Sequence, residues 1–446
     1  MIIKPADRIR GRLRMPGDKS ISHRAAIMAA LSDGRTRIDN FSTSEDCTAT
    51  LMCLEQLGVT VERVGTRVEI EGVGSDGLRA SGAPLDCHNS GSTMRMLAGV
   101  LASQDFVSEL TGDESLRARP MNRIIEPLKM MGAHIESTDG HAPLRITGRR
   151  RLEPITYVMP LASAQVKTSI LLAGLSAKGR TKVIEASNST RDHTERMLEW
   201  FGVPVTYRDP RRNDAELRSI SITGPAQLKA RDGTVPGDIS SAAYFITAAF
   251  LLASSELKIE DLGLNPTRTA IVSTLGAVGA KVLTIPKNSG SGCEDFNEPF
   301  GNIEITGVAR LAPLEVGRSN VLSGVLISQL IDELPMISVL GTQMPGGLTL
   351  RDAAELRVKE TDRIAATAKN LRAMGVQVEE HDDGVTIKEC TTLHGAKLNS
   401  YGDHRIAMAF SIAALIADGE SEIVDAECVG VSFPEFYELL ESVVER

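Results

Sequence analysis

The sequence predicts an α/β protein made of six repeats of one unit, and two interleaved series of segments support this prediction. In one series an amphipathic helix ends in glycine and a short alternating strand follows, at residues 54–62, 128–136, 198–205, 275–282 and 371–379. Glycine is the usual residue just beyond a helix, because it takes the left-handed conformation without steric penalty. In the other series the helices are rich in Ala, Gly and Ser, at Ser22–Leu31, Ser92–Leu101, Ser163–Leu175, Ser240–Leu252, Pro335–Leu340 and Arg405–Leu415. Such repeats form either a solenoid or two domains with three units each around a pseudo-threefold axis.

Two similar tetrapeptides indicate where one domain gives way to the other. Met15-Pro-Gly-Asp18 and Val235-Pro-Gly-Asp238 each precede a small-residue helix. We therefore expect one domain over 18–235 and a discontinuous one over 1–17 plus 236–446, closed by a sixth amphipathic helix near the C-terminus. The stretch 287–299 is rich in Gly, Ser and Asn, which favour turns, so we expect a surface loop there.

Composition restricts the class of protein. The 446 residues carry a net charge of −9 and only 4% aromatic side chains, which argues against nucleic-acid binding. No apolar run approaches the roughly 18 residues of a membrane span, and the N-terminus lacks the apolar core of a signal peptide. The six cysteines are scattered without a CxxC pair. These features indicate a cytoplasmic protein with reduced thiols and no membrane partner.

The surrounding sequence does not support two common functional motifs, one for dinucleotide binding and one for zinc binding. Gly72–Gly77 matches GxGxxG, but no helix follows it, so dinucleotide binding is not expected. The eight histidines form no HExxH and no spacing with cysteine that is typical of zinc, so we expect no metal site. We interpret His193 and His404 as structural hydrogen-bonding residues.

Cationic residues beside helix starts are the main functional signal. The turn at Pro16-Gly17 brings Lys19 and Ser20 to the start of a helix, whose free amide groups and dipole favour an anion. Similar positions recur along the chain: Lys19, Arg24, Arg95, Arg119, Arg191, Lys359, Arg363 and Arg405. Taken singly, each is an ordinary solvated charge. Together, in an acidic protein, they indicate a site for small, multiply anionic substrates.

Two carboxylates lie among these cations. Asp332 follows an apolar segment just before a helix, and Glu360 lies between Lys359 and Arg363. Glu360 is also consistent with an ordinary acidic residue in the first turn of a helix. Carboxylates buried beside bound anions have raised pKa values, which suits them to proton transfer.

Six ordered motifs together resemble the 5-enolpyruvylshikimate-3-phosphate synthase family over nearly the whole chain. They are Pro16–Arg24, Asn89–Arg95, Gly112–Pro120, Ala162–Gln165, Leu356–Arg363 and Gly402–Arg405. Ser163-Ala-Gln-Val-Lys167 and Thr190–Arg196 resemble the bacterial subgroup called class II. The resemblance implies two domains, each of three βαβαββ units, an arrangement known as an inside-out α/β barrel.

The resemblance also implies a reaction and its residues. The enolpyruvyl group of phosphoenolpyruvate is transferred to the 5-hydroxyl of shikimate 3-phosphate and phosphate is released, a step toward chorismate and the aromatic amino acids. Shikimate 3-phosphate is expected to bind Lys19, Ser20, Arg24, Ser163, Gln165, Arg191, Asp332 and Lys359. Phosphoenolpyruvate is expected to bind Lys19, Gly91, Arg119, Gln165, Arg363 and Arg405.

Within this reaction Asp332 is the candidate base for the hydroxyl, and Glu360 is the candidate acid for the methylene of phosphoenolpyruvate. Lys19 either stabilises the leaving phosphate or shuttles a proton, and the sequence leaves both roles open. No cofactor or metal is expected, because phosphoenolpyruvate is already activated, and we expect a monomer. Val431 stands where many members carry a lysine, so one anion contact is missing or supplied elsewhere.

Two other functions compete with this one. The related UDP-N-acetylglucosamine enolpyruvyl transferases carry a reactive cysteine where this chain has Glu114. A non-catalytic binder of sugar phosphates would be expected to lose Asp332 or Glu360, and both are present.

Gly91 bears on inhibition by glyphosate, which competes with phosphoenolpyruvate in this family. Insensitive class II members have alanine at the matching position. Because Gly91 leaves that space open, we expect this chain to be sensitive. Ser92 and Met96 replace the Thr and Pro that are common in sensitive members of the other subgroup.

Overall fold

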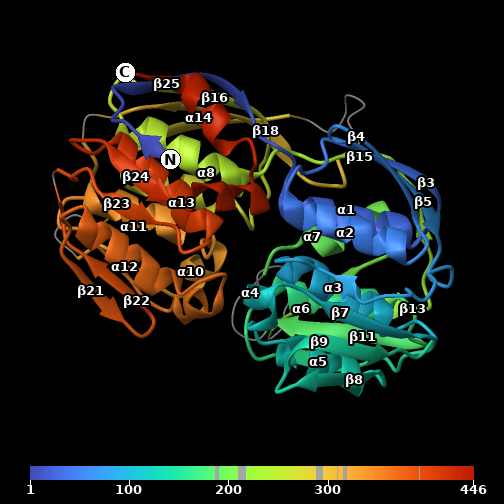
Figure 1. Ribbon diagram of the computed structural model, residues 1–446. Coiled ribbons are helices and arrows are strands. Elements are labelled where there is room, and N and C mark those ends of the chain that lie inside the picture. Colours follow the sequence, from blue (N-terminus) through green and yellow to red (C-terminus); the bar gives the residue numbers. More distant parts are fainter. Residues whose placement is uncertain (186–189, 209–216, 288–294, 309, 315–318, 391) are drawn as a thin grey trace. The chain divides into compact units, whose positions relative to one another are not determined.

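The computed structural model describes the whole chain except residues 186–189, 209–216, 288–294, 309, 315–318 and 391 (Figure 1). Its described residues form two compact units. The central unit comprises Gly17–Val235 and residues 295–298, and the terminal unit comprises Met1–Pro16, residues 236–287 and Pro299–Arg446.

The central unit contains three sheets of one design. In each, two parallel strands are followed by an antiparallel hairpin. The first sheet is β14 (Leu228–Lys229), β3 (Ser32–Asp39), β5 (Arg67–Val73) and β4 (Thr60–Val64), with β15 (Gly233–Thr234) also on β3. The second is β6 (Leu85–Asp86), β7 (Val107–Thr111), β9 (His141–Thr147) and β8 (His134–Thr138). The third is β10 (Thr156–Met159), β11 (Gly179–Glu185), β13 (Arg218–Gly224) and β12 (Thr206–Arg208).

The helices of the central unit connect these strands, so that the second and third sheets follow the order βαβαββ. They are α1 (Lys19–Ala30), α2 (Glu45–Gln56), α3 (Gly91–Leu101), α4 (Glu114–Arg117), α5 (Asn122–Met130), α6 (Ala164–Gly174) and α7 (His193–Trp200). The first sheet differs in that its parallel partner β14 comes from the end of the unit's main chain segment.

The terminal unit repeats the design. One sheet is β17 (Lys281–Pro286), β18 (Phe300–Thr306), β16 (Glu256–Gly263), β2 (Arg8–Arg14) and β25 (Val444–Glu445). Another is β19 (Val321–Leu322), β20 (Leu348–Leu350), β22 (Gly384–Ile387) and β21 (Val378–His381). In the last, β1 (Ile2–Ile3), β24 (Ser421–Val424) and β23 (Lys397–Asn399), the N-terminal strand β1 takes the place of the hairpin.

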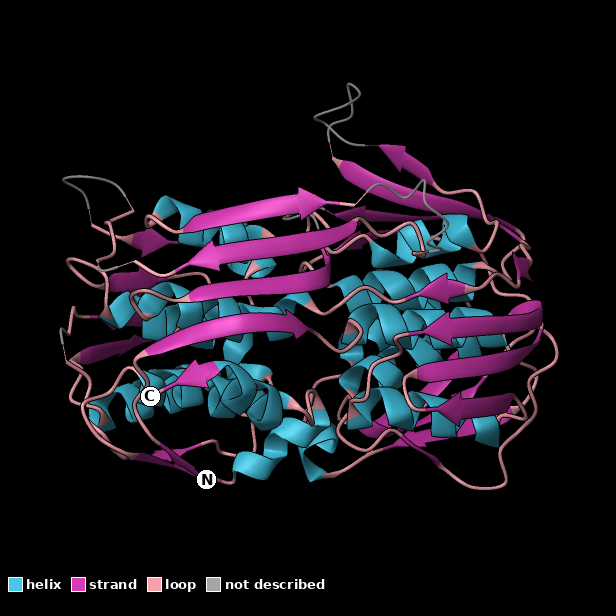
Figure 2. Ribbon diagram, turned by 90° about the horizontal axis from the view of Figure 1, so that it is seen from above, coloured by secondary structure: helices cyan, strands magenta, loops and turns pink. Residues whose placement is uncertain are grey.

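The helices of the terminal unit are α8 (Ile239–Leu251), α9 (Ala270–Ala277), α10 (Val325–Gln329), α11 (Leu334–Thr342), α12 (Arg363–Ala373), α13 (His404–Leu415) and α14 (Phe436–Val443), with short 3₁₀ helices η1 (Ala354–Val358) and η2 (Ala426–Val431). Within each unit, helices fill the interior and strands lie outside (Figure 2). This arrangement confirms the predicted inside-out α/β fold.

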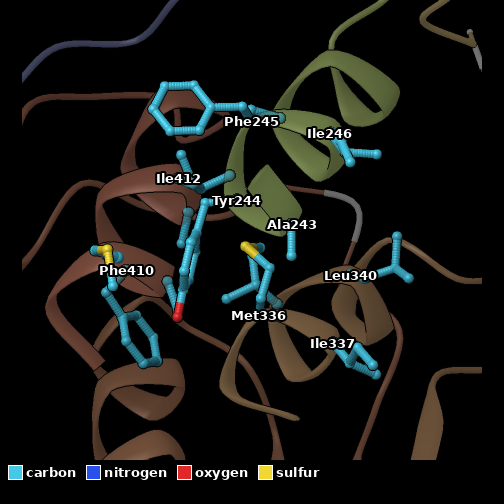
Figure 3. Packing of buried hydrophobic residues seen from close by; sticks show 14 of the residues in the cluster. Ala243, Tyr244, Phe245, Ile246, Met336, Ile337, Leu340, Phe410 and Ile412 are labelled. Atoms are coloured by element: carbon cyan, nitrogen blue, oxygen red, sulfur yellow. The ribbon is translucent and has the colours of Figure 1, made fainter. Parts of the chain in front are cut away.

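The buried helices are the small-residue helices that the sequence indicates. In the terminal unit, Tyr244 of α8, Met336 of α11 and Phe410 of α13 pack together at the centre (Figure 3). In the central unit, α3 packs on α6 so closely that a Cβ on Gly99 would lie 2.2 Å from the Ser169 carbonyl oxygen. Small side chains are therefore needed where two buried helices meet.

The glycines that end the amphipathic helices also behave as expected. Gly58, Gly132, Gly202, Gly279 and Gly375 have φ angles of 88°, 99°, 88°, 99° and 90°. All five lie in the left-handed region, where a side chain is disfavoured.

The prediction of a surface loop over 287–299 is wrong at its C-terminal end, while 288–294 lie outside the described residues. Phe296 is fully buried in the central unit and stacks on Phe201 with ring centroids 6.2 Å apart. Glu298, 2% exposed, bonds His193 Nδ1 through Oε1 at 2.8 Å. The buried ring of Phe296 and the buried carboxylate of Glu298 thus fix residues 295–298 in the central unit. His193 makes the structural hydrogen bond that the sequence suggested.

A second buried histidine links three helices of the central unit. His23 Nδ1 lies 2.7 Å from Thr50 Oγ1, and Thr50 Oγ1 lies 2.7 Å from Thr93 Oγ1, which joins α1, α2 and α3. Burial, and then the charges of Lys19 and Arg24, lower the pKa of His23 well below its usual 6.5. The folded protein therefore keeps His23 neutral.

This low pKa predicts a dependence of stability on pH. Below about pH 6.5 the unfolded chain binds a proton at position 23 that the folded chain does not, so the free energy of unfolding falls by up to about 1.4 kcal/mol per pH unit until the folded-state pKa is reached. Urea unfolding between pH 7 and 5 should show a shallower fall for His23→Gln than for wild type. His134→Gln, at a side chain 68% exposed, should keep the wild-type slope. Equal slopes for His23→Gln and wild type would contradict the assignment.

Candidate active site

The start of α1 carries the first group of cations. Asp18 caps the helix by accepting a hydrogen bond from the Ile21 amide at 3.0 Å, which fixes the turn before Lys19 and Ser20. Lys19 Nζ donates to Asp46 Oδ2 at 2.8 Å, and its side chain remains 18% exposed. The ammonium is thus oriented at the positive end of a helix and is accessible to an anion.

Arg24 lies one turn further along α1 and is only 2% exposed. Its guanidinium donates to Thr194 Oγ1 at 2.7 Å, to Thr168 Oγ1 at 2.9 Å and to the Ser20 carbonyl at 2.7 Å. Burial, and then the charge of Arg191, lower the pKa of Arg24 to about 10. Two guanidinium groups therefore lie near each other, and a bound dianion would relieve their repulsion.

A buried ion cluster holds the segment that carries Arg191. Lys167, on α6 and fully buried, donates from Nζ to Glu185 Oε1 at 3.1 Å and to Glu195 Oε1 at 2.5 Å. Glu185 Oε1 also accepts from the Thr190 amide at 3.0 Å and from its hydroxyl at 2.6 Å. Because Thr190 immediately precedes Arg191, this cluster fixes the backbone at that arginine.

A second pair of guanidinium groups surrounds the start of α3. Arg95 Nη1 donates to Gln165 Oε1 at 2.7 Å, and Arg119 Nη2 donates to Asn89 Oδ1 at 2.6 Å. A Cβ added to Gly91 would lie 3.1 Å from Arg95 Nη1 and 3.3 Å from Arg119 Nη1. Gly91 thus borders directly on both cations, next to the amide groups of a helix start.

In the terminal unit the site is organised around Arg363, which begins α12 and is 2% exposed. Its Nε donates to Asp403 Oδ2 at 2.7 Å, and its Nη2 donates to Glu360 Oε2 at 2.6 Å. Its Nη1 lies 3.7 Å from Asp332 Oδ1. Burial alone would lower the pKa of Arg363, but Asp403 and Glu360 outweigh it and raise the pKa. One permanent cation therefore separates two carboxylates that are each 18% exposed.

A second buried arginine, Arg405, lies at the start of α13. Although burial opposes it, the proximity of Tyr244, Asp332 and Glu333 raises the pKa of Arg405 well above its usual value. Asp238, the cap of α8, has its pKa lowered by Arg405 and Arg268 in spite of its burial. Burial lowers the pKa of Lys359, an effect that Asp332 partly offsets.

The structure brings the predicted residues together in two groups, one in each unit. In the central unit these are Lys19, Ser20 and Arg24 on α1, Gly91 on α3, Ser163 and Gln165 at the start of α6, and Arg119 and Arg191 in the connections before α5 and α7. In the terminal unit they are Asp332, Lys359, Glu360, Arg363 and Arg405. The alternative of solvated surface charges is wrong for Arg24, Arg95, Arg119, Arg363 and Arg405, which are at most 8% exposed.

The alternative reading of Glu360 is also wrong. The helix α12 begins at Arg363 with Asp362 as its cap, and its first turn contains no acidic residue. Glu360 therefore lies before the helix, and its carboxylate is oriented by Arg363 rather than by the helix dipole.

Several charged residues of these groups were missed in the sequence. Asp46 and Asp403 hold Lys19 and Arg363, and Arg268 lies against Asp332 and Glu333. The position of Asp403 just before the small-residue helix α13 offers a signal, since Asp18 and Asp238 precede their helices in the same way. Arg268 offers no such signal.

Neither a membrane span nor a metal cluster occurs in the described part of the chain. Across the described ranges, no helix is long and apolar enough to cross a membrane. Among the same residues, no group of three or more His, Cys, Asp or Glu side chains is arranged to hold a metal ion.

Comparison with known proteins identifies the family. The model for EPSP synthase (3-phosphoshikimate 1-carboxyvinyltransferase) matches residues 3–440. The chain is 49% identical to 3-phosphoshikimate 1-carboxyvinyltransferase of Koribacter versatilis, covering 100% of this chain and 99% of that protein. It is 48% identical to the enzyme of the same name from Akkermansia muciniphila, covering 96% of each. The chain belongs to the EPSP synthase family.

Solved structures support the same conclusion. EPSP synthase from Acinetobacter baumannii superposes with a TM-score of 0.84 at 39% identity, covering 99% of this chain and 98% of that one. The enolpyruvyl transferase NikO from Streptomyces tendae superposes with a TM-score of 0.77 at 19% identity, which shows a shared fold.

Proposed function

We propose that this chain transfers the enolpyruvyl group of phosphoenolpyruvate to the 5-hydroxyl of shikimate 3-phosphate and releases phosphate. The observation that carries the proposal is the pair of accessible carboxylates, Asp332 and Glu360, on either side of the buried Arg363 guanidinium. The reaction needs one group that removes a proton and another that supplies one, beside a fixed positive charge for an anionic substrate.

Asp332 is proposed to accept the proton of the 5-hydroxyl as its oxygen attacks C2 of phosphoenolpyruvate. The guanidinium groups of Arg268 and Arg363 lie 4.0 and 3.7 Å from its carboxylate, and a nearby opposite charge favours the charged form of an acid. An ionised carboxylate is the form that a general base requires.

Glu360 is proposed to protonate the methylene carbon, which makes C2 electrophilic. Binding of a second anion beside Arg363 favours protonation of Glu360, because like charges raise a carboxyl pKa. The addition gives a tetrahedral intermediate with a methyl group. The methyl group then loses a proton to the carboxylate that Glu360 has become, and phosphate departs, which restores the enol ether. Lys19 either stabilises the phosphate or carries a proton.

The substrate contacts are proposed unit by unit. In the central unit, shikimate 3-phosphate binds Lys19, Ser20, Arg24, Ser163, Gln165 and Arg191, and phosphoenolpyruvate binds Lys19, Gly91, Arg119 and Gln165. In the terminal unit, Asp332 and Lys359 serve the first substrate, and Arg363 and Arg405 serve the second. The burial of Arg24 and Arg119 and their neutral partners Thr194, Thr168 and Asn89 support the roles in the central unit. Val431, half-buried in η2, contributes no charge.

The subgroup, oligomeric state and compartment are proposed as well. The two stretches that resemble class II contact each other, since Lys167 pairs with Glu195. We propose a monomer, which sedimentation would test. The described cysteines Cys47, Cys53, Cys87, Cys390 and Cys428 are free thiols, which supports a cytoplasmic protein that cell fractionation would test.

The proposed reaction is tested by measuring phosphate release. Release should require both shikimate 3-phosphate and phosphoenolpyruvate, and the enolpyruvyl ether should form in equal amount. A chain that binds both substrates without releasing phosphate would be a non-catalytic binder. Activity only with UDP-N-acetylglucosamine as acceptor would favour the related transferase.

Asp332→Asn should keep the shape of the site and remove the base. We expect kcat to fall by about 10²- to 10⁴-fold, the usual contribution of a positioned acid or base. The affinity for shikimate 3-phosphate should change by less than roughly tenfold, because one hydrogen bond only changes its character. Steady-state kinetics and calorimetry measure the two effects. Asp382→Asn, at an exposed position of the same unit, serves as the control, and near-wild-type turnover of Asp332→Asn would remove Asp332 from the mechanism.

Gly91→Ala should make the enzyme resistant to glyphosate. The new methyl group would lie against the guanidinium groups of Arg95 and Arg119 and take space from the longer inhibitor. We expect glyphosate to inhibit the wild type in competition with phosphoenolpyruvate, and the substitution to weaken inhibition by at least about 1.4 kcal/mol, or tenfold. The KM for phosphoenolpyruvate should change less.

Inhibition curves at fixed phosphoenolpyruvate provide the comparison. Gly82→Ala is the matched control, because a Cβ at Gly82 meets nothing within 4 Å. Equal resistance of wild type and Gly91→Ala would mean that another residue shapes the pocket.

A further inference from the structure

Two buried guanidinium groups face the carboxylate of Asp332, one on each oxygen. Arg268 Nη1 lies 4.0 Å from Oδ2, and Arg363 Nη1 lies 3.7 Å from Oδ1. Both arginines are at most 3% exposed, and neither Nη1 has a hydrogen-bond partner among the described residues. Buried N–H groups are costly to leave unpaired, so their direction toward one carboxylate calls for an explanation.

Arg268 is held in place from its other side. It lies between β16 and α9, and its Nη2 donates to Ser240 Oγ on α8. The same hydroxyl donates to Glu333 Oε1, and Arg268 Nη2 lies 3.6 Å from that oxygen. Ser240 and Glu333 therefore anchor Nη2 and leave Nη1 directed at Asp332.

The cations around Asp332 differ in which other acidic groups they also interact with. Arg363 pairs with Asp403 and Glu360, and the charge of Arg405 acts on Tyr244, Glu333 and Asp238 as well as on Asp332. Lys359 is partly exposed and lies 4.0 Å from Glu355. The acidic groups nearby are Glu333, which Arg268 and Ser240 hold, and Glu360, which Arg363 holds. The Nη1 of Arg268, which has no hydrogen-bond partner among the described residues, thus lies 4.0 Å from Asp332 Oδ2.

We propose that Arg268 is a positioning residue that orients Asp332 and keeps its carboxylate ionised for proton removal. This inference rests on the proposed function, in which Asp332 is the base. Because Oδ2 lies on the side of Arg268, Oδ1 is the oxygen that we expect to accept the proton of the hydroxyl. Without Arg268 the carboxylate would bind a proton more readily and lose its fixed orientation.

A purely structural role for Arg268 makes a different prediction. In that case the arginine only compensates the buried charge of Glu333, and its loss would lower stability or the amount of active enzyme at every pH. The positioning role instead predicts a loss of activity that depends on pH.

The test is the pH profile of kcat for wild type, Arg268→Gln and Arg268→Lys, with both substrates saturating. Arg268→Gln keeps a donor for Ser240 but loses the charge, so its acid limb should move to higher pH by about one unit. Arg268→Lys retains the positive charge, so its acid limb should return most of the way to the wild-type position. Above the limb, kcat of Arg268→Gln should recover in part, and the deficit that remains reports the lost orientation of Asp332.

Two further variants keep the test decisive. Arg268→Gln with Glu333→Gln removes both buried charges together, so it avoids leaving one unpaired. Its acid limb should also move upward, but by less than in Arg268→Gln, because loss of the Glu333 charge acts in the opposite direction. Arg372→Gln is the matched control, because it removes an arginine charge of the same unit at the far end of α12, where the side chain is 44% exposed. Its acid limb should stay within about 0.3 unit of wild type, well below the unit-sized shift expected for loss of the Arg268 charge.

The outcomes separate this inference from the function on which it rests. An unmoved acid limb in Arg268→Gln and in the double variant, whatever the fall in kcat, overturns the positioning role while the proposed reaction stands. Absence of phosphate release by the wild-type enzyme overturns the reaction and the positioning role together.

Discussion

The ion cluster around Arg363 is the interaction on which the proposed chemistry depends. A guanidinium buried to 2% exposure is costly unless several partners compensate its charge. Asp403 and Glu360 do so directly, and Asp332 lies at a short distance on the third side. Because breaking such a cluster leaves an unpaired charge in the interior, each carboxylate is confined to one position. The same constraint therefore places the two carboxylates that are proposed to exchange protons with the substrates.

The fold supplies these positions through the starts of its buried helices. Five of the six small-residue helices begin with a capping Asp or Ser whose side chain binds the helix amides: Asp18, Ser90, Ser163, Asp238 and Asp403. The site residues Lys19, Gly91, Gln165 and Arg405 follow within two positions. Repetition of one unit thus repeats one kind of helix start, which favours anions, and differences between the units supply different side chains beside it.

Much of this was predictable from the sequence, because it depends on local rules. The glycines at 58, 132, 202, 279 and 375 and the small-residue helices follow from backbone preference and side-chain size. The cations could be found as a set, since they recur beside helix starts. The partners of these cations could not: Lys167 with Glu185, Arg24 with Thr194 and Arg268 with Asp332 join residues 18, 170 and 64 positions apart. The burial of Phe296 was not predicted, because it is a single aromatic residue in a stretch of mostly polar residues.

Solvent deuterium provides the most direct test of transfer by addition and elimination. In this mechanism the methylene carbon of phosphoenolpyruvate gains a proton from Glu360, an exchangeable group 18% exposed. The intermediate carries a methyl group that then loses one of its three hydrogens. Turnover in D₂O should therefore place deuterium in the methylene group of the product, as measured by mass spectrometry and NMR. Complete conversion to a product without deuterium at that carbon would contradict the mechanism.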